Sequence, residues 1–164
     1  LGLGASEEAI LEGLKSFAPP AHRLEEHQIG SLTIVDDSIS TTPEATKAAL
    51  ATYPDHPIGL IVGGFDREQD YHDLANHIRT SSVTTIACLP NTGHRLVEAI
   101  AELGIEVDIF EADNLTQAML ELAKKREQFE LLILSPAAPS YNHFRDYVER
   151  GEKFVELAKE LFIS

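Results

Sequence analysis

Short apolar runs alternate with segments of helical periodicity along the whole chain, and turn or capping residues separate them. Runs rich in Val, Ile and Leu predict strands at residues 32–36, 58–62, 84–89, 106–110 and 131–135. Amphipathic segments predict helices at residues 7–17, 43–53, 71–80, 93–103, 115–126 and 141–161. A further strand at residues 22–28 is expected to form a hairpin with 32–36 through Gly30.

The order of these elements predicts the fold class. Nearly continuous apolar strands, each followed by a helix, are typical of a parallel sheet that helices cover on both faces. We therefore predict a doubly wound, Rossmann-like α/β domain with a mostly parallel sheet and an antiparallel hairpin at its edge. Ligands of such sheets bind at the carboxyl ends of the strands. This rule predicts the ligand site at four segments, residues 36–42, 63–70, 89–93 and 135–140.

Composition narrows the function classes. The 164 residues suit a single domain, and they include 27 acidic but 13 basic side chains, a formal charge of −14. This acidity argues against a nucleic-acid-binding surface and against docking on anionic lipid, since both require clustered Lys and Arg. No apolar run reaches the roughly 20 residues of a membrane span. The single cysteine, Cys88, excludes a disulfide framework and a cysteine-rich zinc site.

Several familiar sequence signals are absent. No segment resembles a signal peptide, so a cytoplasmic location is expected. The G-x-x-x-x-G-K-[ST] phosphate loop and the G-x-G-x-x-G fingerprint are missing, so the chain lacks a nucleotide-binding loop of its own. The seven histidines lack metal-ligand spacing, and no metal site is predicted. The chain begins at Leu1 rather than Met, and we expect it to be a fragment of a longer protein.

The segment 36–42 combines an acidic pair with a run of hydroxyls. Asp36 and Asp37 are adjacent in a strand, so their side chains point to opposite faces and do not form an acid/base couple. One of them is expected to contact a ribose hydroxyl or a cation, and a solvated strand end or a loop hydrogen bond is the alternative. The hydroxyl-rich residues 38–42 lead into a helix N-terminus, which favours an anion, and plain helix capping is the alternative.

Two further features lie at the expected ligand edge. Gly63 and Gly64 permit a tight turn or the close approach of a ligand, and Arg67 is suited to bind a carboxylate through two hydrogen bonds. A surface arginine beside a turn is the alternative interpretation. Ser140 and Tyr147 are seven residues apart, so we expect them on one face of the last predicted helix.

Three stretches together resemble the C-terminal domain of the Mur ligases. They are residues 20–25 (PAHRLE), 36–46 (DDSISTTPEAT) and 134–140 (LSPAAPS). The continuation at residues 144–151 (FRDYVERG) and the Gly63-Gly64 loop fit the D-glutamate-adding member of the family best. The similarity covers almost the whole chain in the right order.

The resemblance implies one domain of a three-domain, ATP-dependent ligase of peptidoglycan precursor synthesis in the cytoplasm. In this family ATP, with Mg²⁺, phosphorylates the carboxylate of UDP-N-acetylmuramoyl-L-alanine. The amine of the incoming glutamate then attacks the acyl phosphate. The N-terminal domain binds the UDP-sugar, the central domain is the ATPase, and the C-terminal domain presents the amino acid and closes over ATP. The isolated domain is therefore expected to be inactive and to bind no cofactor tightly.

The resemblance also assigns residues to the two ligands, and it assigns this domain no metal ligand and no certain catalytic group. The assigned positions are His22, Arg23 and Asp37 for ATP, and Thr41, Arg67, Ser140 and Tyr147 for the carboxylates of the amino acid. Many members carry lysine where this chain has Arg67 and Ile39. These departures leave the D isomer of glutamate, the L isomer and another amino acid all open. A stand-alone binding module for a small acidic metabolite is the alternative outside the enzymes.

Overall fold

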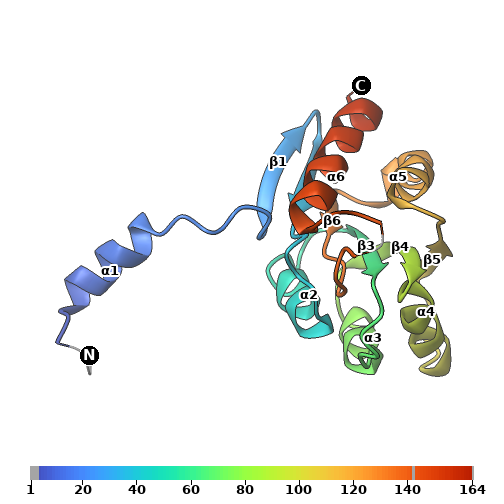
Figure 1. Ribbon diagram of the computed structural model, residues 1–164, viewed down its shortest axis with the longest axis horizontal. Coiled ribbons are helices and arrows are strands. Elements are labelled where there is room, and N and C mark those ends of the chain that lie inside the picture. The colour runs from blue at the N-terminus through green and yellow to red at the C-terminus, as the bar shows by residue number, and fades with distance from the viewer. Residues whose placement is uncertain (1–3, 142, 164) are drawn as a thin grey trace.

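A computed structural model describes residues 4–141 and 143–163 as a six-stranded sheet with helices on both faces (Figure 1). The strand order is β1-β2-β6-β3-β4-β5. The strands are β1 Glu25–Ile29, β2 Leu32–Asp36, β3 Ile58–Gly64, β4 Val83–Asn91, β5 Asp108–Glu111 and β6 Leu131–Leu134. All neighbours pair in parallel except β1 and β2, which form the antiparallel edge hairpin. The predicted fold class is confirmed.

The described helices, except the first, divide between two apolar cores, one on each face of the sheet. The helices are α1 Glu7–Ser16, α2 Pro43–Leu50, α3 His72–Ile78, α4 Gly93–Glu102, α5 Leu115–Lys124 and α6 Tyr147–Phe162, with a 3₁₀ turn, η1, at Arg126–Gln128. One core joins α5 and α6 to the sheet through Met119 and Phe154. The other joins α2, α3 and α4 to it through Leu50, Leu74 and Leu96. Figure 1 shows the two sets of helices on opposite sides.

Side-chain acceptors cap the first turns of four described helices, α1, α2, α5 and α6. Thr42 accepts a hydrogen bond from the backbone N–H of Ala45, and Pro43 occupies the first turn of α2. Asn114 caps α5 by accepting from the N–H of Gln117 at 2.9 Å. Each side-chain acceptor pairs one of the N–H groups that a helix leaves without an internal partner.

The last helix begins later than expected. The predicted helix at 141–161 starts at Tyr147, because Asp146 supplies the cap and accepts from the N–H of Glu149 at 2.9 Å. Glu149 in turn accepts from the N–H of Arg145, the residue before the cap. The segment before Asp146 is therefore a loop at the carboxyl edge of the sheet.

The first strand is also shorter than expected. The strand predicted at 22–28 begins at Glu25, because His22 and Leu24 adopt positive φ angles of 60° and 48° and form a turn instead. The other predicted strands are found with small shifts at their ends.

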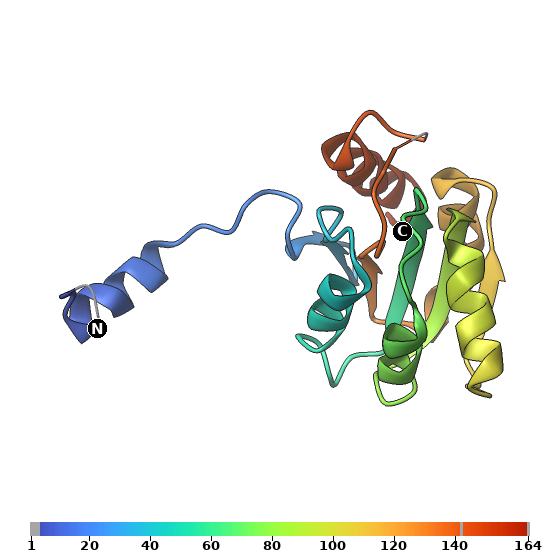
Figure 2. The ribbon, with the colours of Figure 1, turned by 60° about the horizontal axis from the view of Figure 1, so that its bottom comes forward.

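The N-terminal helix α1 lies apart from the sheet (Figures 1 and 2). None of its residues is buried, although it carries an apolar stripe. Leu11, Leu14 and the following Phe17 are 55%, 68% and 67% exposed. Among the described residues, no helix has the length and apolar character needed to cross a membrane.

Candidate functional site

The loops that follow β2, β3 and β6 meet at the carboxyl edge of the sheet. The N–H of Asp37 donates to the carbonyl of Leu134 at 2.9 Å, which joins the ends of β2 and β6. The N–H groups of Gly63 and Phe65 donate to carbonyls of the β6–α6 loop, at Pro136 and Pro139. Three of the four segments predicted from the sequence are therefore neighbours in space, as a parallel sheet requires, and the fourth, at 89–93, joins them through Gly63 and Gly64.

The paired glycines at the end of β3 pack against the protein's own loops. Gly63 has a φ of +125°, and a Cβ there would approach the carbonyl oxygen of Leu89 to 2.5 Å. A Cβ on Gly64 would collide with the carbonyl oxygen of Pro139. Thr92 bonds both backbone groups of Gly64 through its hydroxyl. Gly63 thus allows β3 to lie close against β4 at Leu89, and Gly64 allows it to lie against the β6–α6 loop.

Asp37 is 2% exposed and has partners for both carboxylate oxygens. Its Oδ1 accepts from the N–H of Leu24 at 3.3 Å, and its Oδ2 accepts from the hydroxyl of Ser135 at 2.7 Å. Burial raises the pKa of the Asp37 carboxyl, and its hydrogen bonds, to Ser40, Ser135 and Leu24, partly oppose that rise. The carboxylate therefore connects three segments of the site.

Arg150 on α6 was not selected from the sequence, yet it is the largest fully buried side chain. Its Nε donates to the hydroxyl of Ser38 at 2.9 Å, and its Nη2 donates to the carbonyl of Ser38 at 2.7 Å. Its Nη1 donates to the carbonyl of Ala138 at 3.0 Å. Arg150 thus ties the β2–α2 loop to the β6–α6 loop.

The helical spacing of apolar residues in the sequence indicates that Arg150 is buried. Phe154 and Leu157 follow Arg150 at intervals of four and seven residues, so all three lie on the buried face of α6. Among the described residues no carboxylate lies within ion-pair distance of the guanidinium. Burial lowers the pKa of Arg150 to about 9, and the charge of Asp36 opposes that shift.

The three residues predicted for ATP cluster where the chain enters β1. Arg23 is exposed on the turn between His22 and Leu24. Its neighbours are held to the end of β2, since His22 Nδ1 lies 2.7 Å from Asp36 Oδ2 and Leu24 bonds Asp37. A cationic side chain therefore stands at the edge of the site on an anchored turn.

The four residues predicted for the amino acid are spread over three loops and the start of α6. Ser140 is buried, Thr41 is half-buried and Arg67 is exposed. The Arg67 guanidinium lies 5.9 Å from the ring centre of Tyr141, next to Ser140. Tyr147 is 36% exposed, and its ring meets that of His22 at 6.0 Å.

The expected helix face shared by Ser140 and Tyr147 is wrong. Ser140 lies in the loop before α6, while Tyr147 is the first residue of that helix. Asp146 caps the helix, so α6 begins at Tyr147 and leaves Ser140 in the preceding loop. The two side chains are therefore positioned by separate elements.

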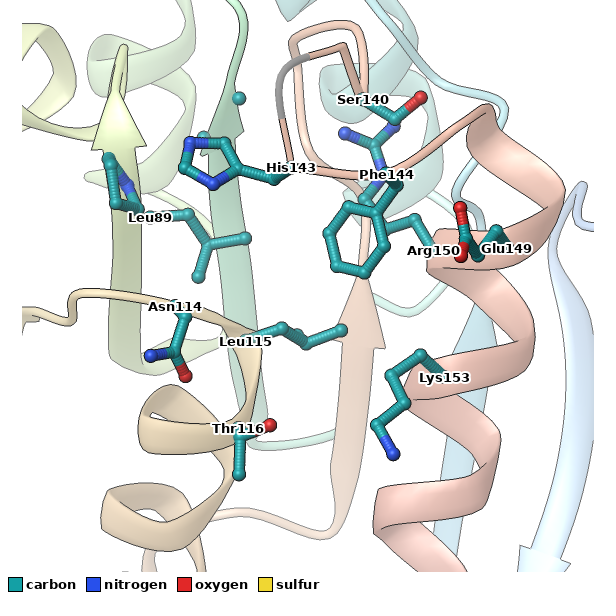
Figure 3. Close-up of a pocket in the computed structure, with 13 residues that line it drawn as sticks. Leu89, Asn114, Leu115, Thr116, Ser140, His143, Phe144, Glu149, Arg150 and Lys153 are labelled. Atoms are coloured by element: carbon teal, nitrogen blue, oxygen red, sulfur yellow. The ribbon is translucent and has the colours of Figure 1, made fainter.

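A cavity of about 330 Å³ opens between the start of α5, α6 and the glycine loop (Figure 3). Leu89, Leu115 and Phe144 form its apolar walls, and Ser140 lies on its rim. Lys153 also lines it, with its Nζ 2.7 Å from Glu156. The sequence did not predict this cavity, because its walls come from four separate loops and helices.

Cys88 is 1% exposed, and burial raises the pKa of its thiol to about 12. A thiol in this state is protonated at neutral pH and unreactive. Cys88 is therefore a small core residue of β4.

No protein-family model matches the chain, but individual proteins do. The chain is 37% identical over 162 residues to a UDP-N-acetylmuramoyl-L-alanine–L-glutamate ligase of Xanthomonas oryzae pv. oryzae. This match covers 95% of the chain but 34% of that protein. It is 34% identical over 158 residues to a UDP-N-acetylmuramoylalanine–D-glutamate ligase of Rubrobacter xylanophilus, with 95% and 35% covered. The chain therefore spans about a third of the length of these relatives.

A similar fold is found among solved structures. The MurF ligase of Thermotoga maritima in complex with ADP matches with a TM-score of 0.64 and 16% identity. The match covers 98% of this chain and 35% of that one. At this identity the comparison supports the fold alone.

Proposed function

This chain is, by sequence and by fold, a C-terminal domain of the Mur ligase family, and from that premise we propose that its enzyme joins glutamate to UDP-N-acetylmuramoyl-L-alanine. The observation that carries the proposal is the 37% identity over 95% of the chain to a ligase of that name. In the proposed reaction ATP phosphorylates the carboxylate of the acceptor. The glutamate amine then displaces phosphate from the acyl phosphate and forms an amide. We propose the cytoplasm as its location, because ATP and UDP-linked precursors are found there.

We propose that this chain is the C-terminal third of a three-domain enzyme. The share of the relatives that it covers supports this organisation, as does the absence of a phosphate loop from its sequence. The exposed apolar stripe of α1, with Leu11, Leu14 and Phe17, is a surface suited to pack against a neighbouring domain. The ATPase chemistry would then reside in the central domain.

Within this domain, Arg23 is the residue best placed to meet ATP. Its side chain is exposed and cationic, so it suits a phosphate. We propose that His22 and Asp37 lie on the ATP side of the site together with Arg23. His22 belongs to the same turn and bonds Asp36 at the end of β2, and Asp37 accepts from the N–H of Leu24. Among the described residues no three His, Cys, Asp or Glu side chains are grouped to hold a metal ion. We propose that Mg²⁺ accompanies ATP and is held by the central domain of the enzyme.

We propose that glutamate binds where the β2, β3 and β6 loops meet, with its carboxylates facing Thr41, Arg67, Ser140 and Tyr147. Arg67 supplies the positive charge, and the hydroxyls supply further donors. Ile39, at the position where many members carry lysine, offers no second cation. We propose L-glutamate as the isomer, because the Xanthomonas relative is named for it.

The test uses the complete ligase that contains this domain. Phosphate release is measured with ATP, Mg²⁺, UDP-N-acetylmuramoyl-L-alanine and either isomer of glutamate, with both isomers of aspartate as controls. We expect release that depends on glutamate and on the UDP-linked acceptor, with a higher kcat/KM for the L isomer. A preference for the D isomer would overturn the assignment of the isomer alone. Glutamate binding without any ATP turnover would instead indicate a binding module.

A further inference from the structure

Arg23 lies at the centre of a turn with a strained backbone. The residues on either side of it, His22 and Leu24, have φ angles of 60° and 48°, which side-chain-bearing residues adopt only when the surroundings hold them there. The Arg23 side chain itself makes no hydrogen bond or ion pair with the described residues. Its position therefore depends on what anchors its two neighbours.

Four hydrogen bonds anchor those neighbours. The N–H of His22 donates to Glu25 Oε2 at 2.9 Å, and its carbonyl accepts from the N–H of Ile39 at 3.2 Å. The N–H of Leu24 donates to Asp37 Oδ1 at 3.3 Å. The fourth bond joins the side chains of His22 and Asp36, and three of the four thus connect the turn to the end of β2 and its loop.

The His22–Asp36 pair is the most enclosed of these anchors. Its Nδ1–Oδ2 distance is 2.7 Å, and the two side chains are 13% and 1% exposed. The other oxygen of Asp36 accepts from the N–H of Ser38, so the carboxylate also fixes the start of the β2–α2 loop. A hydrogen bond to a charged group with little solvent around it is stronger than one at the surface.

Gly151 provides the space for this pair. A Cβ at position 151 would come within 2.8 Å of Asp36 Oδ1, and closer still to Oδ2 and to His22 Nδ1. Glycine inside a helix costs about 1 kcal/mol relative to alanine. Gly151 lies inside α6 with an ordinary helical backbone, so the contact with the pair is what its missing side chain permits.

We propose that the His22–Asp36 pair, seated against Gly151, positions Arg23 for the phosphates of ATP. The inference rests on the proposed function for the identity of the ligand. His22 is then a positioning residue, because its Nδ1 is engaged inside the domain and its effect reaches ATP through Arg23. A turn held in advance spares the binding step the cost of ordering it.

The first test needs no activity and uses this 164-residue chain. Amide hydrogen exchange is measured for Gly151→Ala and for Gly13→Ala, a matched helical glycine with nothing within 4 Å of its added Cβ. We expect Gly151→Ala to speed exchange at least tenfold at the N–H groups of Leu24 and Ile39. The N–H of Leu60 in the central strand β3 should not change, and Gly13→Ala should alter none of the three. Equal acceleration at all three amides, or none, would overturn the positioning role.

The second test is a double-mutant cycle in the complete ligase. We expect Gly151→Ala and His22→Leu each to raise the KM for ATP at least tenfold in the wild-type background, and to have no further effect when Arg23 is already Ala. His22→Asn keeps a donor at the Nδ1 position and should stay within threefold of wild type. Additive effects in the Arg23→Ala background would refute the inference. A wild-type enzyme without glutamate-dependent turnover would refute the proposed function instead. The hydrogen-exchange measurement would still test whether the His22–Asp36 pair holds the turn.

Discussion

Asp37 and Arg150 are both buried at the carboxyl edge of the sheet, but their partners differ. Asp37 has a hydrogen-bond donor at each oxygen, while Arg150 donates to a hydroxyl and two carbonyls. Neither is neutralised by an ion pair among the described residues. Each therefore carries a desolvation cost that its hydrogen bonds offset, and each makes a separate prediction.

Arg150→Met is expected to lower the free energy of unfolding by about 2 kcal/mol, because it leaves buried carbonyls at Ser38 and Ala138 without a donor. Urea denaturation of the 164-residue chain measures this change. The control is Arg145→Met, since that arginine is 75% exposed, and it should stay within about 0.5 kcal/mol of wild type. Equal stability of the two variants would show that the buried hydrogen bonds contribute little.

Asp37 is expected to make stability depend on pH. Its pKa is raised in the folded protein, so the folded state binds its proton more tightly than the unfolded state does. The contribution of this group to stability is therefore present at low pH and declines as pH rises above 3.8 through the folded-state pKa. Asp37→Asn removes this titration. The difference in Tm between the variant and wild type should then grow with pH across that window, and a difference independent of pH would contradict the assignment.

Arg67 is expected to control glutamate binding in the complete ligase. A hydrogen bond to a charged group contributes about 1.5–3 kcal/mol, so Arg67→Ala should raise the KM for glutamate about ten- to hundredfold. Arg67→Lys should be partly tolerated, and Ile39→Lys should recover part of the loss in Arg67→Ala. Glutamate titrations at saturating ATP measure these effects. A glutamate KM for Arg67→Ala within twofold of wild type would exclude Arg67 from the site.

At the scale of elements, the start of α6 determines where the site loop ends. Asp146 caps this helix, and the loop before it carries Ser140. The first turns of the helix carry three residues of the site, Tyr147, Arg150 and Gly151. Tyr147 meets the ring of His22, Arg150 donates to the carbonyl of Ala138, and Gly151 lies against the carboxylate of Asp36. Misplacing the start of this one helix would displace all of them.

Asp146→Ala is therefore expected to lower the free energy of unfolding by about 1 kcal/mol through the loss of the cap. The matched control is Ser6→Ala, which removes the cap of α1. Since α1 buries no residue, Ser6→Ala should leave the unfolding of the sheet unchanged. Urea denaturation followed by the fluorescence of a probe on the sheet separates the two, and similar losses in both variants would mean that α1 is part of the core.

For the molecule as a whole, the sheet with its five covering helices forms the cooperative unit, while α1 presents apolar side chains outside it. Removing residues 1–18 is expected to change the Tm of the chain by less than about 2 °C, because none of residues 4–18 is buried. In the complete ligase, Leu14→Asp should reduce stability, because the stripe is proposed to pack on a neighbouring domain. Thermal denaturation checks both. A large loss of Tm on truncation would contradict the first expectation. An unchanged Tm of the Leu14→Asp ligase would contradict the second.

The sequence by itself determined the order of the elements, the doubly wound fold and the edge of the sheet that carries the ligand loops. These properties follow from local periodicity and from caps such as Thr42 and Asn114, whose effects extend over a few residues. The family motifs also lay in continuous stretches, so they were legible without a structure.

Only the tertiary structure decided how those loops are held. Arg150 reaches Ser38 across 112 positions of sequence, and His22 meets Asp36 in the space left by Gly151. Such contacts depend on distances between segments far apart in the chain, and a pattern of neighbouring residues does not encode those distances because packing sets them only once the sheet has formed.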